Sequence, residues 1–260
     1  MKESSPIFII GAARSGTSII AGALKVAAGI PGHNEGHYLS MMEGLIQTAT
    51  THLLDQRKKD PSDKVMMAHI TTETLTEDIM EMMKKRMDLQ FPNEEVWFDK
   101  TPDGNMVRMV PFIIKMWPKA RFIFTKRRSI ENIASRLRKF KHLTFERNCL
   151  HWANVMKRWQ YVRAELPKGS WIEIEQRETG LNPEKVGEEL GAFLALDEKQ
   201  IAAMKKFLKT ERYEFSGGDE KNTKGLNDMG WTEEELKVFK ELCSPLNVVY
   251  GYSEDSSYYL

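Results

Sequence analysis

The sequence predicts a single α/β domain: a three-layer, P-loop-like fold with a central, mostly parallel sheet flanked by helices. The first observation is an apolar run, Phe8 to Ile10, that leads through a glycine-containing loop into a helix expected at 17–24. The second is that further short apolar strands, at 96–98, 121–125 and 171–174, alternate with longer amphipathic helices. The third is that the 260 residues contain no internal repeat, low-complexity stretch or linker, so we expect one domain over 1–260.

Composition excludes several classes of protein. Lys and Arg number 38 against 37 Asp and Glu, so the net charge of +1 gives no basic field for a nucleic-acid partner. Two cysteines imply no disulfide framework and allow a reducing compartment. Apolar runs stay well short of the roughly 20 residues of a membrane span, and the N-terminus lacks a signal-peptide pattern. We therefore expect a cytoplasmic protein without a membrane span.

The loop after the first strand has the spacing of a phosphate cradle. Gly11, Gly16, Thr17 and Ser18 satisfy G-x-x-x-x-G-K-[ST] at every fixed position except the Lys, which is replaced by Thr17. That Lys normally reaches the β- and γ-phosphates, so its absence argues against ATP or GTP hydrolysis. Arg14 supplies instead a planar fork for a second anionic group. The alternative is an ordinary α/β turn with a chance arginine.

A second loop, at 30–38, carries candidate general bases. His33, Glu35 and His37 fall within five positions of one another, and a hydroxyl substrate needs a carboxylate or imidazole of this kind within hydrogen-bond reach. The alternative is that Asn34 caps the next helix and that Glu35 lies near its N-terminus for the dipole.

Two more strand ends carry cations. Lys100 follows the strand at 96–98, at the sheet edge where open α/β folds bind ligands. The alternative, which is compatible with this role of Lys100, is a plain strand-to-helix loop with Thr101 as cap and Pro102 at the first helical position. The run 126–128, Lys-Arg-Arg, follows the strand at 121–125 and predicts a second anion site, against the alternative of a solvated charged face.

Apolar periodicity predicts the remaining elements. Helices are expected at 38–54, 71–89, 106–117, 130–140, 149–166, 182–194, 199–208 and 231–246, with a charged surface connection at 55–63. Met80, Met83 and Met87 have the spacing of core residues. The polar loop 216–227 contains Lys221 and Lys224, which either close over a phosphate or belong to a plain surface loop.

Taken together, these residues resemble the sulfotransferases that use 3′-phosphoadenosine 5′-phosphosulfate (PAPS), especially the bacterial-type branch and the tyrosylprotein sulfotransferases. The 5′-phosphosulfate loop of that family is similar to 11–18, and its 3′-phosphate motif to Arg127 with Ser135 eight positions on. The turn Lys100-Thr101-Pro102 and the tail from Gly230 to Tyr252 are also similar, so four motifs occur in the family's order. Two departures stand out: Arg14, where many members have Lys although the tyrosylprotein branch has Arg, and 127–129, where Arg-Asp-Pro is common.

The resemblance implies in-line sulfuryl transfer from PAPS to a hydroxyl or amine acceptor, with PAP as product and no metal. It implies that Ala13, Arg14, Ser15, Gly16, Thr17 and Ser18 bind the 5′ group and that Arg127 and Ser135 bind the 3′ phosphate. Arg14 and Lys100 would stabilise charge on the leaving oxygen. Glu35, spaced from Arg14 as in the tyrosylprotein branch, is the candidate base, with His37 and His33 as second choices.

Other interpretations stay open at this point. They are a nucleotide or small-molecule kinase on a degenerate P-loop, and a non-catalytic nucleotide-binding protein of this fold. We expect a small-molecule or lipid-like acceptor in a pocket built from 38–50, 65–89 and the 140–148 loop, because Met41, Met42, Met66 and Met67 suggest an adaptable apolar wall. The sequence leaves the oligomeric state undetermined.

Overall fold

The structure, a computed structural model, describes residues 4–211 and 223–260. In these residues a five-stranded sheet has the order β2-β3-β1-β4-β5, and every neighbouring pair is parallel. The strands are β1 (Ile7–Gly11), β2 (Gly32–His33), β3 (Phe98–Lys100), β4 (Arg121–Lys126) and β5 (Trp171–Glu175). The predicted α/β class is confirmed.

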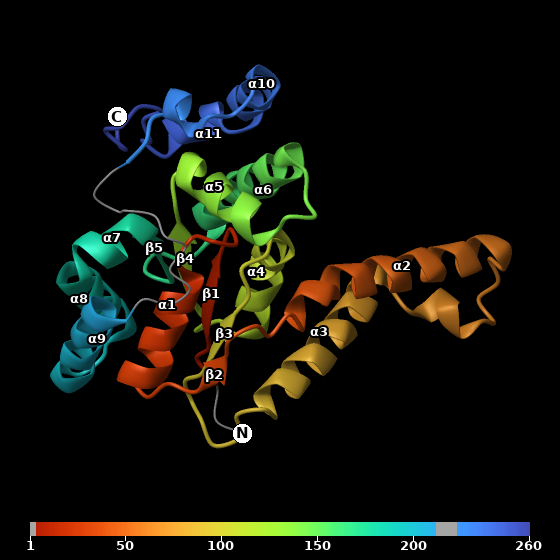
Figure 1. Cartoon of the computed structure of the whole chain (residues 1–260). Helices are drawn as coiled ribbons and strands as arrows, with labels where there is room; N and C mark the ends of the chain where they lie inside the picture. Colours follow the sequence, from red (N-terminus) through yellow and green to blue (C-terminus); the bar gives the residue numbers. More distant parts are fainter. Residues whose placement is uncertain (1–3, 212–222) are drawn as a thin grey trace.

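The alternation of side chains along β1 explains the three layers. Phe8 and Ile10 join one buried cluster, and Ile7 and Ile9 join another on the opposite face of the sheet. The first cluster includes residues of α4 (Gly104–Met116) and α6 (Phe145–Glu165); the second includes residues of α1 (Thr17–Gly22), α8 (Pro183–Leu194) and α9 (Glu198–Thr210). Figure 1 shows α1, α8 and α9 on one side of the strands and α4 and α6 on the other.

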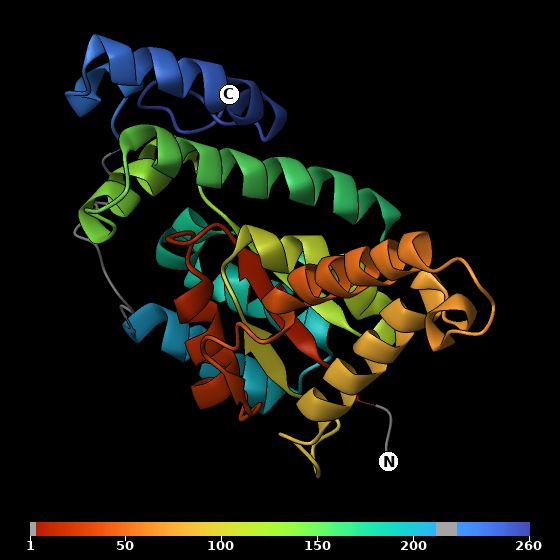
Figure 2. The same cartoon turned by 90° about the vertical axis from the view of Figure 1, so that its right-hand side faces the viewer.

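A helical pair extends from this body. It consists of α2 (Met42–Lys59) and α3 (Thr72–Asp88), joined through the 3₁₀ turn η3 (Met66–His69). Figure 1 shows it reaching away from the sheet, and Figure 2 shows it from that side, in front of the sheet. Met80, Met83 and Met87 anchor α3 in the core, as their spacing predicts. The connection expected at 55–63 is wrong over its first half, because α2 continues to Lys59. The basic residues of its last turn interact favourably with the negative, C-terminal end of the helix dipole, and this interaction stabilises the longer helix.

The remaining elements differ from the predictions mainly at their ends. α4 begins at Gly104 with Asp103 as N-cap, so Thr101 and Pro102 precede the helix and are not its cap and first residue. The predicted helix at 231–246 is two helices, α10 (Glu233–Leu242), which Thr232 caps, and α11 (Ser244–Val249). The other described helices are η1 (Ala23–Ala27), η2 (Leu39–Met41), α5 (Ser129–Lys139), α7 (Gln176–Leu181) and η4 (Leu226–Met229).

The C-terminal segment is fastened to the sheet by two buried titratable side chains. Arg128 is fully buried and donates to the carbonyl oxygens of Ser253, Asp255 and Lys224. Glu175, at the end of β5, accepts hydrogen bonds from the hydroxyls of Tyr252 and Tyr258. Within the described parts of the chain, no helix combines the length and apolar character needed to span a bilayer.

Candidate functional site

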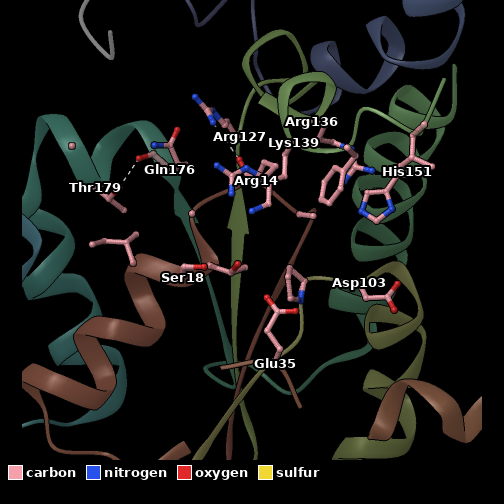
Figure 3. A pocket seen from close by; sticks show the side chains of 18 of the residues that line it. Arg14, Ser18, Glu35, Asp103, Arg127, Arg136, Lys139, His151, Gln176 and Thr179 are labelled. Atoms are coloured by element: carbon pink, nitrogen blue, oxygen red, sulfur yellow. Dashed lines mark hydrogen bonds between the residues drawn. The ribbon is translucent and has the colours of Figure 1, made fainter. Parts of the chain in front are cut away.

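The strand order places the predicted site residues in a row at one edge of the sheet. Because all strands are parallel, their carboxyl ends share this edge. Glu35 follows β2, Lys100 ends β3, the loop 12–16 follows β1, and Arg127 follows β4. A cavity of about 640 Å³ opens above the edge, within the size range of small-molecule sites. Figure 3 shows Arg14 and Arg127 in its middle and Glu35 below them.

Most of the predicted site residues line this cavity, and all the others except His33 support them from behind. The lining includes Ala13, Arg14, Gly16, Thr17, Ser18, Glu35, His37 and Arg127. Ser15, Lys100 and Ser135 are almost fully buried and contact lining residues or their neighbours. His33 is instead part of β2, where its ring lies 5.1 Å from that of Phe91. The structure therefore gives His33 no place in the cavity lining.

The loop after β1 has the backbone of an anion cradle. Gly11 and Gly16 have φ of 149° and 90°, and a Cβ on Gly11 would lie 2.3 Å from the carbonyl oxygen of Thr125. Gly16 is the N-cap of α1 and has no side chain to accept from the first-turn backbone N–H groups, and it lines the cavity together with Thr17 and Ser18. Asn132 of α5 fixes the loop by donating to the carbonyl oxygen of Ala13 and to Ser15 Oγ, at 3.1 and 2.9 Å. Sequence reasoning missed this role of Asn132.

The two predicted anion sites meet directly. Arg14 Nε donates to Ser135 Oγ at 3.1 Å, and Arg127 Nη1 donates to the carbonyl oxygen of Arg14 at 3.3 Å. Burial lowers the pKa of Arg127. Its Nε is buried and has no hydrogen-bond partner in the described parts of the chain. Such an atom is a donor in place for an anion.

The run at 126–128 does not act as one site. Only Arg127 lines the cavity. Lys126 pairs with Glu173 at 2.8 Å, and Arg128 turns away to bind the C-terminal segment and Glu131. The prediction of a three-cation site is therefore wrong for Lys126 and Arg128, because carboxylates and carbonyls far along the chain compete for them.

Glu35, Lys100 and His37 form one cluster. Lys100 Nζ lies 2.7 Å from Glu35 Oε1, and His37 Nε2 lies 2.8 Å from Glu35 Oε2. Partial burial of Glu35 would raise its pKa, but the hydrogen bonds and charges of Lys100 and His37 outweigh it and hold the pKa below its usual value. Glu35 is therefore an ionised carboxylate at neutral pH, able to accept a proton.

The backbone beneath this cluster is tightly packed. The His37 N–H donates to Thr101 Oγ1 at 3.2 Å, and Thr101 Oγ1 donates to Asp99 Oδ1 at 2.7 Å. Burial raises the pKa of Asp99. A Cβ on Gly36 would lie only 1.7 Å from Asp99 Oδ2. Glycine at position 36 thus lets the loop approach β3 closely enough to place Glu35 over Lys100.

Several lining residues were not singled out as site residues by the sequence. They come from the start of α4, from α5 and α6, and from α7: Asp103, Arg136, Lys139, His151, Gln176 and Thr179. One signal was present for Arg136: it falls at helical spacing with Asn132 and Ile133, on the buried stripe of α5. Of the three segments expected to build the acceptor pocket, the 140–148 loop lines this cavity through Phe140, His142 and Leu143, whereas 38–50 and 65–89 supply no lining residue.

Of the four methionines assigned to the wall of that pocket, Met42 is in the core, and Met41 and Met66 are exposed. Lys221 lies outside the described residues. Lys224 binds Arg128 through its carbonyl oxygen and does not line the cavity. In residues 4–211 and 223–260 no group of His, Cys, Asp or Glu is arranged to hold a metal ion.

Known proteins resemble this chain in fold. Sulfotransferase STF9 from Mycobacterium avium matches with a TM-score of 0.56 and 15% identity, covering 96% of this chain and 76% of its own. The sulfotransferase domain of the Synechococcus PCC 7002 olefin synthase matches with a TM-score of 0.56 and 15% identity, and the match covers 97% of each chain. A retinol dehydratase in complex with androsterone and inactive cofactor PAP matches with a TM-score of 0.52 and 12% identity, covering 94% of this chain and 80% of its own. No curated protein sequence matches significantly.

A family model settles the assignment. The model described as "Sulfotransferase family" matches residues 6–200, most of the chain, including the loop after β1, Lys100, Arg127 and Ser135. As the resemblance to the PAPS-dependent enzymes predicted, the chain belongs to the sulfotransferase family.

Proposed function

We propose that this protein transfers the sulfuryl group of PAPS to a hydroxyl of a small-molecule acceptor. The observation that carries the proposal is the row Glu35, Lys100, Arg14, Arg127 along one sheet edge, in which Glu35, Arg14 and Arg127 line one cavity and Lys100 contacts Glu35 from behind. Glu35 and Lys100 lie at one end of this row, and at the other lies the half-buried Arg127, whose buried Nε has no partner among the described residues. The complex of the similar retinol dehydratase with PAP and androsterone supports a nucleotide and a small molecule as the two ligands.

The residues fit the donor nucleotide. Two of its anionic groups match two donor sets: the loop 13–18 with Arg14, and Arg127 with Ser135. The fit rests on Arg127 Nε, a buried donor without a partner in the described chain, and on the uncapped start of α1. When bound, PAPS supplies the sulfuryl group, which forms a bond to the acceptor oxygen as its bond to the phosphate oxygen breaks.

Glu35 receives the acceptor proton in this proposal. Its carboxylate is already ionised, and His37, at 2.8 Å, helps to orient it. Protonation of Glu35 weakens its pairing with Lys100, which contacts it at 2.7 Å. The ammonium of Lys100 then stabilises, together with Arg14, the negative charge that develops on the leaving oxygen. His37 is the second candidate for the base.

The test measures transfer and nucleotide choice separately. Labelled sulfate from PAPS should reach members of a hydroxyl and amine acceptor panel, and Arg14→Ala and Arg127→Met should each weaken PAP binding. PAP should raise the melting temperature more than ATP with magnesium does, because a specific ligand stabilises the folded state by mass action. Stabilisation by ATP with magnesium alone would favour a kinase, and PAP binding without any transfer would favour a non-catalytic nucleotide-binding protein.

A further inference from the structure

One wall of the cavity carries a buried cation that the proposed transfer does not use. Arg136 of α5 lines the cavity with only 2% of its surface exposed. In the described parts of the chain its side-chain contacts are with neutral groups: Nε donates to Asn148 Oδ1 at 3.1 Å, and the guanidinium lies 4.9 Å from the Phe140 ring centroid. Its Nη1 is buried without a partner.

Arg136 is charged, and among the described residues no carboxylate pairs with it directly. Burial lowers its pKa to about 10, so the side chain is still a cation at neutral pH. A buried charge without a counter-ion is strongly unfavourable, and it is expected where a ligand supplies the opposite charge. Asn148, itself fully buried and bonded to the carbonyl oxygen of Thr144 at 2.9 Å, holds the guanidinium in position.

A second unpartnered nitrogen lies on the same wall. His151 Nε2 is buried and has no hydrogen-bond partner among the described residues. Burial and the charge of Arg136 lower the pKa of His151 to about 4, so the ring is neutral at pH 7 and can donate one N–H. Lys139 adds an exposed cation to the lining. Asp103 is a negatively charged residue on the same wall. Its carboxylate caps α4, where it accepts a hydrogen bond from the Asn105 N–H at 3.0 Å.

This wall lies on the acceptor side of the cavity. In Figure 3, Arg136, His151 and Asp103 lie on one side of Arg14, and Gln176 and Thr179 lie on the other. Pro102 and Asp103 follow directly on Lys100 and Thr101, so the wall continues from the end of β3, beside Glu35. A molecule with its hydroxyl at Glu35 would therefore present its other end to Arg136 and His151.

We propose that the acceptor carries an oxyanion, a carboxylate or a phosphate, besides its hydroxyl, and that Arg136 and His151 bind it. The identity of this ligand as the acceptor rests on the proposed function. The anion compensates the charge of Arg136 and accepts from the free Nη1 and from the imidazole N–H. A hydrogen bond to a charged group contributes roughly 1.5–3 kcal/mol, so an anionic ligand should bind about ten- to a hundredfold more tightly than its neutral analogue.

The experiment uses the full chain loaded with PAP, which has no sulfuryl group to transfer. Titration calorimetry compares 4-hydroxyphenylacetate, 4-hydroxybenzylphosphonate and the neutral 4-hydroxyphenylacetamide. The wild type should prefer at least one anion by tenfold or more, and the carboxylate and phosphonate arms tell which oxyanion fits. Arg136→Met should abolish the preference, Arg136→Lys should keep part of it, and Arg138→Gln, on the exposed face of the same helix, should leave it unchanged.

Histidine NMR gives a readout that needs no variant. The bound anion should raise the pKa of His151 above about 4, and the amide should not. Equal affinity of the wild type for anions and amide would overturn the proposal. It would also be overturned if Arg136→Met weakened PAP binding as much as anion binding, since Arg136 would then belong to the nucleotide site. Failure of the sulfotransferase function appears separately, as absence of transfer from PAPS with the anion preference intact.

Discussion

The two edge strands of the sheet each lead into a glutamate, and the two glutamates are in opposite environments. Glu35, after β2, is half-exposed and lies between Lys100 and His37, and its pKa is lowered. Glu175, at the end of β5, is buried and held by two tyrosine hydroxyls, and burial raises its pKa to about 7. A carboxylate near a cation and solvent is available for proton transfer, whereas one enclosed by tyrosines fastens the C-terminal segment. The comparison predicts that the first controls turnover and the second controls stability.

Glu35→Gln should have the largest effect of these variants, and it should lower turnover without weakening nucleotide binding. The amide keeps the size of the side chain but accepts no proton, so turnover should fall by about 10²- to 10⁴-fold, the usual contribution of a general base. PAP affinity should change little. Steady-state rates with PAPS and PAP titrations measure the two effects. The control is Glu43→Gln, which removes a carboxylate that pairs with Arg108 at 3.0 Å outside the cavity lining. Wild-type turnover in Glu35→Gln would transfer the base role to His37.

Glu175→Gln should act on stability and on its dependence on pH. The folded-state pKa of about 7 lies above the ordinary value of 4.5, so the folded protein holds this proton more tightly than the unfolded chain does. The stability from this group is therefore fully present below about pH 4.5 and is lost as the pH rises through 7. The shift corresponds to a loss of about 3 kcal/mol.

Urea unfolding from pH 5 to 8 measures this effect. The wild type should lose stability over this range relative to Glu175→Gln, whose amide stays neutral. Parallel stability curves for the two proteins would mean that Glu175 is already ionised in the folded state, and the contrast with Glu35 would then disappear.

The local sequence predicted which residues lie at the cavity better than it predicted the distant residues with which side chains and strands pair. The loop 11–18, Lys100, Arg127 and Ser135 were identified because each follows a strand or belongs to a spaced motif, and a parallel sheet brings strand ends to one edge. β2 was missed because two residues carry little strand signal, and its pairing with β3 joins positions far apart in the chain. Arg128 was misassigned for the same reason, since its carbonyl partners lie about a hundred residues away.

Gly36→Ala tests whether the close packing of the loop against β3 positions Glu35. The added Cβ would meet Asp99 Oδ2 at 1.7 Å, so the loop must move away from β3. Overpacking of this kind costs about 2 kcal/mol, and turnover should fall because Glu35 and His37 move together. Gly44→Ala is the matched control, since its Cβ would meet nothing within 4 Å and α2 should gain up to about 1 kcal/mol. Thermal unfolding and PAPS turnover of both variants check the contrast; full activity in Gly36→Ala would argue that the loop position is not critical.

Arg127→Lys should have the smallest effect. Lysine keeps the positive charge at position 127, which lies between the two edge glutamates along the sheet, and removes only the planar fork of the guanidinium. Arg127 already uses Nη1 on the carbonyl oxygen of Arg14, and its buried Nε, which has no partner among the described residues, is a donor available to a bound anion. A lysine presents one compact ammonium and cannot make both contacts in the same geometry. PAP should bind about tenfold more weakly, close to the strength of one hydrogen bond, and calorimetry measures the change. Lys141→Gln, an exposed cation beyond α5, should leave PAP affinity unchanged. If lysine at 127 bound PAP as well as arginine does, the charge alone would hold the anion, and the unpartnered Nε would have no part in recognition.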